Sequence, residues 1–281
     1  MPRPHIEFIQ TQMLPWIKNT KINAPQEIKL KNLSNDNISR ASTNIIKYPA
    51  EFSICNQYHV KCDEEFFVLN GAITINNINY QEGDYGFFPA GFSRFNIRCK
   101  KETDILTFYE GNNKHIFSND DVFYNKSKLI TKIETLNADW GKATDPKILA
   151  MGVKRLGLRS DPDNGETTWL LKIECNVMDA DYDNQEVHPV VEEVFVLSGE
   201  MHLPSGVLKR GAYFWRPPNI PHGPVGTKKG AIGIFRSKGG PLTTIWTKEK
   251  YPVQWNAKYS PSIPKFFLKN LTLNYDENLP Y

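Results

Sequence analysis

Acidic side chains and a histidine crowd the start of the stretch EVHPVVEEVFVLSGE, residues 186–200. Side chains alternate between the two faces of a strand, so a continuous strand would place Glu186, His188 and Glu192 on one face. Such groups are costly to turn towards a core unless a cation neutralises them. His222 ends the later segment GAYFWRPPNIPH. Two imidazoles with one or two carboxylates suit a divalent metal ion with open coordination positions, most like non-haem iron.

Each of these assignments has a simpler alternative. The cluster could be a hydrogen-bonded polar patch inside a barrel mouth. Glu186 could be a metal ligand, a catalytic base, or a carboxylate that stands beside the ligands. Glu193 has the opposite parity to Glu192, so we expect it to face solvent or to pair with a basic side chain.

The segment GAYFWRPPN also supplies candidates for a substrate pocket. Tyr213 and Trp215 alternate with Phe214 and Arg216, so one of the two faces should line the barrel interior near the metal. Tyr213 and Trp215 are candidates for the pocket wall, and the alternative is a purely structural role in the core. Arg216 is a candidate for binding a carboxylate substrate, and its alternative is a structural salt bridge.

Sequence repeats indicate that the chain is built twice. EEFFVLNG at residue 64 recurs as EEVFVLSG at 192, and GDYGFFPAG at 83 recurs as GAYFWRPPN at 211. IEFIQTQMLPW at 6 matches ITKIETLNADW at 130. Repeats of this kind fix the number of domains. We predict an N-terminal barrel over residues 1–125, a C-terminal barrel with the metal site over 126–250, and an extended tail over 251–281 that packs over a barrel or a partner subunit.

The elements that must position these residues are short strands. Apolar runs broken by turn residues fill both copies, and helical periodicity is weak throughout. Asn164-Gly165 lies between two strand-like runs, which predicts a hairpin. Many short strands at regular spacing predict an all-β fold, with a barrel or sandwich in each half.

The two motifs of the second copy resemble those of the cupin superfamily. His188, Glu192 and Gly199 match the first cupin motif, in which a histidine pair is followed by glutamate and glycine. Glu186 stands in place of the first histidine of that pair. The resemblance implies two tandem cupin barrels, each a jelly roll (double-stranded β-helix). It implies His188, Glu192 and His222 as metal ligands, with Glu186 as a further candidate.

The second cupin motif runs from glycine through proline and glycine to histidine. Gly211, Pro217 and His222 match it, and Asn219 stands where the family has its second glycine. The chain also resembles a bacterial group of two-cupin (bicupin) proteins whose second barrel reads E-x-H-P-x-x-E-E and then R-P-P-x-x-x-H-G-P. That group has no settled activity, so the resemblance implies a fold and a site but no substrate.

The first copy keeps the same motifs but loses the closing histidine. His59 and Glu64 match the first motif, Gln57 takes the place of the leading histidine, and Arg94 takes the place of the last. An arginine stays protonated and cannot be a metal ligand. We therefore predict a barrel without metal, in which a Glu64–Arg94 ion pair replaces the ion. The alternative is that Arg94 binds an anionic ligand.

The leading functional hypothesis is a metal-dependent enzyme that acts on a small organic molecule. A His/His/Glu ligand set suits an Fe(II) dioxygenase, and the same site with Mn, Ni or Zn could serve an isomerase or cyclase. The hypothesis from another class is a non-catalytic cupin that senses or stores a small ligand or metal.

Composition excludes some partners. The chain has 281 residues and a net charge of +3 with scattered basic residues, so we expect no nucleic acid as partner. It has no apolar run long enough for a bilayer and no signal-peptide pattern, which predicts a cytoplasmic protein that does not bind membranes. Four cysteines without metal-finger spacing are expected to be reduced thiols. A homodimer through barrel edges or the tail is compatible with this fold.

Overall fold

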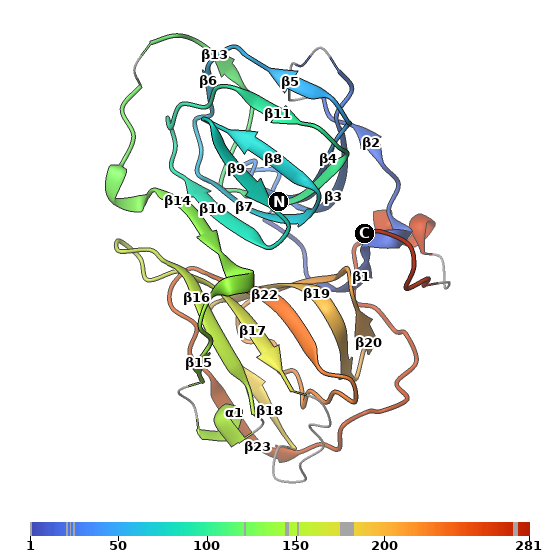
Figure 1. Cartoon of the computed structure of the whole chain (residues 1–281). Coiled ribbons are helices and arrows are strands. Elements are labelled where there is room, and N and C mark those ends of the chain that lie inside the picture. Colours follow the sequence, from blue (N-terminus) through green and yellow to red (C-terminus); the bar gives the residue numbers. More distant parts are fainter. Residues whose placement is uncertain are drawn as a thin grey trace. The chain divides into compact units, whose positions relative to one another are not determined.

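The computed structural model describes residues 2–20, 22, 24, 26–120, 122–143, 146–150, 152–174, 183–271 and 275–281. The chain divides into two compact units. The first comprises Met1–Arg3 and Pro15–Ala138, and the second comprises Pro4–Leu14 and Asp139–Tyr281. Antiparallel strands are the main secondary structure of both, which confirms the all-β fold (Figure 1).

The first unit has a seven-stranded sheet, a four-stranded sheet and a strand pair. The large sheet has the order β14-β10-β7-β12-β4-β3-β2, the smaller sheet β5-β11-β8-β9, and the pair is β13-β6. Their bounds are β2 (Ile17–Lys18), β3 (Lys29–Asn35), β4 (Ser42–Tyr48), β5 (Phe52–Ile54), β6 (Tyr58–His59), β7 (Glu64–Asn70), β8 (Ala72–Ile75), β9 (Ile78–Gln81), β10 (Asp84–Phe88), β11 (Ile97–Cys99), β12 (Thr103–Tyr109), β13 (Ile116–Phe117) and β14 (Ile130–Glu134).

The second unit has an eight-stranded sheet and a strand pair. The sheet has the order β1-β21-β19-β22-β17-β16-β15, with β20 paired to β19, and β18 pairs with β23. Their bounds are β1 (Ile6–Gln10), β15 (Gly141–Lys142), β16 (Lys154–Ser160), β17 (Thr167–Ile173), β18 (Asn184–Val187), β19 (Val191–Leu203), β20 (Gly206–Lys209), β21 (Ala212–Arg216), β22 (Ala231–Lys238) and β23 (Ile245–Lys250).

Helices are few and short. They are η1 (Thr11–Met13), η2 (Lys126–Lys128), η3 (Thr135–Asn137), α1 (Pro146–Ala150) and η4 (Lys265–Asn270). Within the part of the chain that the structure describes, every helix falls short of the length and apolar character that a membrane span requires.

The internal duplication reappears in the order of the strands. Read from its β2 edge, the large sheet of the first unit has the order β2-β3-β4-β12. The sheet of the second unit, read from its β15 edge, has the corresponding order β15-β16-β17-β22. The outermost strand is exchanged between the copies. β1, from the start of the chain, pairs with β21, while β14, which resembles it in sequence, pairs with β10. Figure 1 shows β14 beside β10 in the first unit.

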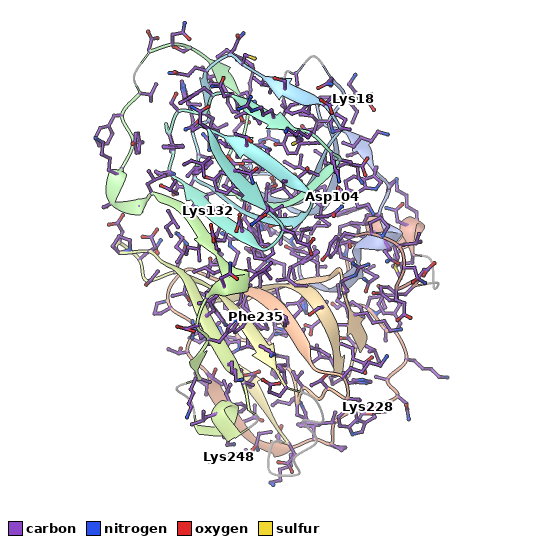
Figure 2. All side chains as sticks on the ribbon, viewed as in Figure 1. Lys18, Asp104, Lys132, Lys228, Phe235 and Lys248 are labelled. Atoms are coloured by element: carbon purple, nitrogen blue, oxygen red, sulfur yellow. The ribbon has the colours of Figure 1, made fainter. Side chains whose placement is uncertain are left out.

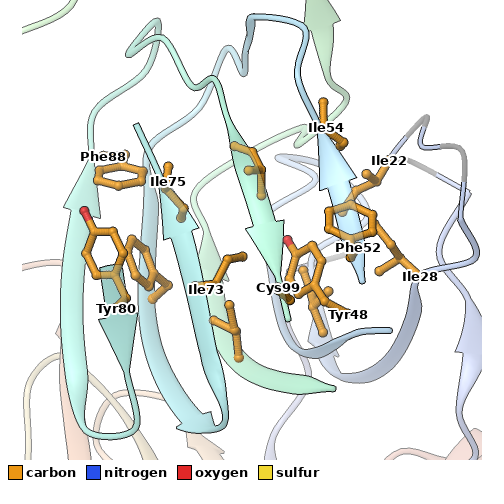
Figure 3. Close-up of a cluster of buried hydrophobic side chains, with 14 of the residues drawn as sticks. Ile22, Ile28, Tyr48, Phe52, Ile54, Ile73, Ile75, Tyr80, Phe88 and Cys99 are labelled. Carbon is orange, nitrogen blue, oxygen red and sulfur yellow. The ribbon is translucent and has the colours of Figure 1, made fainter. Parts of the chain in front are cut away.

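Each unit has its own apolar core. In the first, buried residues such as Phe52, Phe66 and Ile73 form one cluster, part of which Figure 3 shows. In the second, Phe8 from β1 joins a cluster with Trp169, Val194 and others. Phe52 and Ile73 alternate with more exposed neighbours along β5 and β8. The strands that carry Phe66, Phe8 and Val194 have runs of buried residues on both faces.

Turns and the tail complete the framework. The predicted hairpin joins β16 to β17, with Gly165 in the left-handed region at φ 72°. The described tail residues, 251–271 and 275–281, belong to the second unit, where the Tyr259 hydroxyl donates to the Phe8 carbonyl and Tyr281 lies against Phe195. Cys55, Cys62 and Cys99 are free thiols, and Cys175 lies outside the described residues.

Asn219 adopts the left-handed backbone conformation that the glycine of the second motif would adopt. Its φ is 64°, and Gly91 at the matching position of the first unit has φ 83°. Asparagine is one of the few residues with a side chain that adopts this conformation readily. The Asn219 amide donates to the His188 carbonyl at 2.8 Å, so this turn also holds a candidate ligand segment in place.

We predict that Gly199→Ala destabilises the protein by at least about 2 kcal/mol. Gly199 has φ 73°, and an added Cβ would lie 2.0 Å from the carbonyl oxygen of Gly230. The matched control is Gly157→Ala on β16, where a Cβ meets nothing within 4 Å and the change should be within about 0.5 kcal/mol. Equal melting temperatures for the two variants would contradict this account.

Candidate metal centre

Four candidate ligand residues of the second unit come from three neighbouring segments. Glu186 lies on β18, His188 follows that strand, Glu192 lies on β19, and His222 lies in the loop after β21. Glu186 and His222 are joined by two backbone hydrogen bonds, from the Glu186 amide at 2.9 Å and from the His222 amide at 3.0 Å. This bridge fixes one carboxylate beside one imidazole.

Both imidazoles are oriented by backbone carbonyls. His188 Nδ1 lies 2.9 Å from the Thr243 carbonyl oxygen, and His222 Nδ1 lies 3.0 Å from that of Ile220. A carbonyl only accepts, so Nδ1 carries the proton and donates in the neutral ring. Nε2 then holds a free lone pair, and in both residues Nε2 is buried without a hydrogen-bond partner. A buried acceptor fixed in this way is the arrangement of a metal-ligating histidine.

The carboxylates approach these two nitrogens. Glu186 oxygens lie 3.9 Å from His188 Nε2 and 3.5 Å from His222 Nε2. Glu192 Oε2 lies at the same two distances, 3.9 and 3.5 Å. Glu186, His188 and His222 form a group whose ligand atoms all lie within 4.8 Å of one another. Ligands about 2.1 Å from a shared ion and about 90–110° apart are about 3.0–3.4 Å from each other, so a small inward movement would suffice.

Arg216 ties this group to the start of the chain. Its Nη1 contacts Glu192, which is also its cross-strand partner. Its Nε and Nη2 donate to the two oxygens of Glu7 on β1, at 3.0 and 2.5 Å. Arg216 therefore forms structural salt bridges with Glu7 and Glu192, which was the alternative to binding a carboxylate substrate. Glu7 had no motif to mark it, and its role depends on the pairing of β1 with β21.

The charges of this network do not balance. Burial would raise the pKa of Glu7, but the charge of Arg216 and the hydrogen bonds from His5 and Arg216 together hold the pKa well below its usual value. Burial also acts to raise the pKa of Glu186, and the nearby His222, His188 and Arg216 bring it below the usual value. Glu7, Glu186 and Glu192 thus face one guanidinium. When both imidazoles are neutral, as metal ligation requires, two negative charges remain to be balanced, and a divalent cation supplies that charge.

A cavity of about 390 Å³ opens beside the candidate ligands. Glu186, His188, Glu192, Arg216 and His222 line one part of it. Most of the remaining wall is apolar, formed by Ala143, Ile148, Val153, Trp169, Leu171, Ile173, Met201, Leu203, Phe214, Val225, Phe235 and Leu242. Figure 2 labels Phe235 on its strand β22. The size and lining suit a small organic molecule.

Of the three residues predicted for the pocket wall, only Arg216 lines this cavity. Alternation along β21 places Phe214 and Arg216 on the cavity side and turns Tyr213 and Trp215 to the opposite face. There the Tyr213 hydroxyl donates to Glu193 at 2.7 Å. Glu193 also pairs with Arg236 at 2.5 Å, as expected for its parity, although it is buried.

Backbone contacts correct the alignment of the first unit. Tyr58 forms with Arg94 the same two-bond bridge that Glu186 forms with His222. The Gly91 amide bonds to the Val60 carbonyl, as that of Asn219 bonds to His188. Tyr58 and Val60 therefore occupy the places of Glu186 and His188. His59, which the motif spacing had selected, lies between them and faces the other way.

The predicted ion pair of the first unit is confirmed. Arg94 Nη2 lies 2.7 Å from Glu64 Oε2, and Nη1 donates to the Phe92 carbonyl at 2.7 Å. The Tyr109 hydroxyl donates to the other Glu64 oxygen at 3.0 Å. Burial alone would lower the pKa of Arg94, but Glu64 outweighs burial and raises it, so the guanidinium stays charged.

Three further histidines have local roles. His5 Nε2 lies 3.1 Å from Glu7 and so extends the network around Arg216. His115 stacks on Tyr58, and burial followed by the charge of Arg94 lowers its pKa to about 3. His202 follows a predicted hairpin tip in EMHLPSG, where a solvent-facing side chain is expected, but the structure buries it. It is 5% exposed, because its ring contacts Glu200 and the Trp255 carbonyl.

The fold and site define an all-β protein of two barrel units, one of which carries a candidate metal cluster. Residues 7–241 match one family model, and the chain belongs to that family, described as Domain of unknown function (DUF4437). No curated protein matches the chain.

Solved structures with a similar fold include a protein of Nostoc punctiforme described as a "putative dioxygenase". It has a TM-score of 0.78 and 21% identity, and the match covers 88% of each chain. A mutant of Bacillus subtilis oxalate decarboxylase has a TM-score of 0.55 and 11% identity over 85% of this chain and 79% of that one. Hazelnut (Corylus avellana) vicilin has 0.53 and 13%, over 85% and 87%. At these identities the likeness shows the fold.

We predict that Arg94→Met lowers the free energy of unfolding by about 3 kcal/mol, because it leaves the Glu64 carboxylate without its cation. Chemical denaturation measures this loss. The double variant Arg94→Met/Glu64→Gln removes the stranded charge and should recover a substantial part of the stability. A double variant no more stable than Arg94→Met would contradict the pairing.

Proposed function

We propose that the chain is a bicupin whose second unit binds one divalent metal ion and catalyses a reaction of a small organic molecule, with Fe(II)-dependent dioxygenation as the leading candidate. The observation that carries the proposal is the pair of buried, unpartnered Nε2 atoms of His188 and His222, each fixed by a carbonyl on Nδ1. Carboxylate oxygens of Glu186 and Glu192 lie 3.5–3.9 Å from these two atoms, so all four side chains converge on one place.

The residues present fit such an ion. His188, His222 and Glu186 offer two nitrogens and an oxygen, and Glu192 offers a further oxygen beside them. Two histidines with one carboxylate is the ligand set typical of non-haem Fe(II) oxygenases, and Mn, Ni or Zn could also bind these atoms. Such an ion supplies Lewis-acid chemistry and, as iron, redox chemistry.

The protein's own residues would hold and shield the reacting molecule. Arg216 holds the Glu192 carboxylate in place, because the guanidinium contacts it directly. The apolar wall, including Trp169, Phe214 and Phe235, excludes water from the substrate. Few hydrogen-bond partners line the wall, which favours molecules with a mainly apolar body, such as phenols and diketones, over polyhydroxylated sugar acids.

Glu186 supports a second candidate function. It lines the cavity, and if Glu192 rather than Glu186 completes the ligand set, its carboxylate is free to accept a proton from the substrate. The site with Mn, Ni or Zn would then serve an isomerase or cyclase that stabilises an enolate. A sensor that binds the same molecule without turnover is the third candidate.

We expect purified protein supplied with Fe(II), Mn(II), Ni(II) or Zn(II) to retain about one metal ion per chain, and His188→Ala and His222→Ala to retain at least about tenfold less. Elemental analysis measures this. The matched control is His202→Gln, a buried histidine of the same unit that lies apart from the cluster and should leave metal content unchanged. Near-stoichiometric metal in the two alanine variants would sink the metal assignment.

We expect Fe(II)-loaded protein to consume O2 with at least one member of a panel of small diketones and phenols, and His222→Ala to lower the rate at least about a hundredfold. An oxygen electrode and product analysis follow the reaction. Turnover without O2 in the Mn, Ni or Zn form would favour the isomerase instead. Tight binding without turnover in any metal form would favour the sensor.

A further inference from the structure

A second cationic group lines the cavity of the second unit, apart from the Arg216 network. Arg155 lies on β16, where alternation turns it to the same face as Val153, and both line the cavity. Leu171 is its cross-strand partner on β17 and also lines the wall. Arg155 is therefore a half-buried guanidinium within an otherwise apolar part of the wall.

Arg155 differs from the other buried arginines of this unit in its partners. Arg216 and Arg236 each contact a glutamate. Among the described residues, no carboxylate lies within salt-bridge distance of Arg155, and its recorded contact is the face of Trp169, with 4.2 Å from the guanidinium carbon to the ring centroid. Burial lowers the pKa of Arg155, as expected where no counter-charge offsets it. A guanidinium stacked in this way keeps its N–H donors available at its edge.

Trp169 contributes an independent observation at the same place. Its indole Nε1 is a buried donor without a hydrogen-bond partner, although the ring lines the cavity. The ring is itself held by stacking on Phe235, with centroids 5.7 Å apart. Buried donors without partners are rare, and here one accompanies an uncompensated guanidinium.

We propose that Arg155, stacked on the face of Trp169, binds an anionic group of the substrate, so that the substrate class is an organic acid with a mainly apolar body. The inference rests on the proposed function, since it names the molecule that the cavity of the metal centre takes. The planar guanidinium matches a carboxylate in a bidentate manner, and the apolar wall contacts the rest of the molecule.

The test uses octanoate and 4-phenylbutyrate, each beside its neutral amide, at a pH where both acids are ionised. Calorimetric titrations are made with metal-free and with Zn(II)-loaded protein. We expect each acid to bind wild-type protein at least about tenfold more tightly than its amide. Arg155→Met should abolish this preference while leaving amide binding unchanged, and Arg155→Lys should retain part of it, since the charge remains.

The matched control is Lys154→Met, the neighbouring residue on β16, which is exposed and pairs with Glu174. It should keep the full acid preference. An acid preference that is absent from the wild type, or that survives Arg155→Met in folded protein, overturns the proposal. Loss of metal binding is measured separately, so a protein that prefers acids through Arg155 but binds no metal would sink the proposed function and leave this ligand site standing.

Discussion

The guanidinium of Arg216 is the interaction on which the second unit's site depends. It receives Glu7 from β1 and Glu192 from β19, so three strands meet on one buried cation. Removing any one of these partners would leave an uncompensated charge in a place where water cannot solvate it. The network therefore fixes Glu192 next to His188 and His222. It also anchors β1, the first strand of the chain, in the second unit, because Arg216 is the arginine that binds the Glu7 carboxylate.

The two units solve the same physical problem differently. Glu64 and Glu192 occupy equivalent places, paired across the sheet with Phe88 and Arg216 respectively. In the first unit the cation comes from Arg94, the position of His222, and its guanidinium lies over the Phe88 ring. In the second unit the cation is Arg216, the cross-strand partner of Glu192 on β21. The position that matches Arg94 is therefore left to the imidazole of His222. Exchanges at four matching positions, Tyr58/Glu186, Val60/His188, Phe88/Arg216 and Arg94/His222, thus separate a closed ion pair from a site with free ligand atoms.

Sequence patterns predicted the parts that follow from local chemistry. The all-β fold, the hairpin at Asn164-Gly165 and the Glu64–Arg94 pair follow from alternation, turn residues and motif spacing. Glu7 escaped because strand pairing between residues some two hundred positions apart leaves no local signal. Tyr213 and Trp215 show that alternation separates the two faces of a strand but does not say which face lines the cavity. His59 shows that motif spacing alone can select the wrong residue, because His59 lies between Tyr58 and Val60 and faces the other way.

If the proposed function holds, the distribution of charge along the cavity couples the binding of the metal ion to the binding of the organic acid. Without an ion, Glu7, Glu186 and Glu192 exceed Arg216 in charge, so the ligand end would repel an organic acid. A bound divalent ion removes that excess, while Arg155 attracts the acid in either state. Metal binding should therefore strengthen acid binding, and by reciprocity the acid should strengthen retention of the metal. The apolar wall makes this coupling effective, because charges across a region of low dielectric act on one another more strongly than in water.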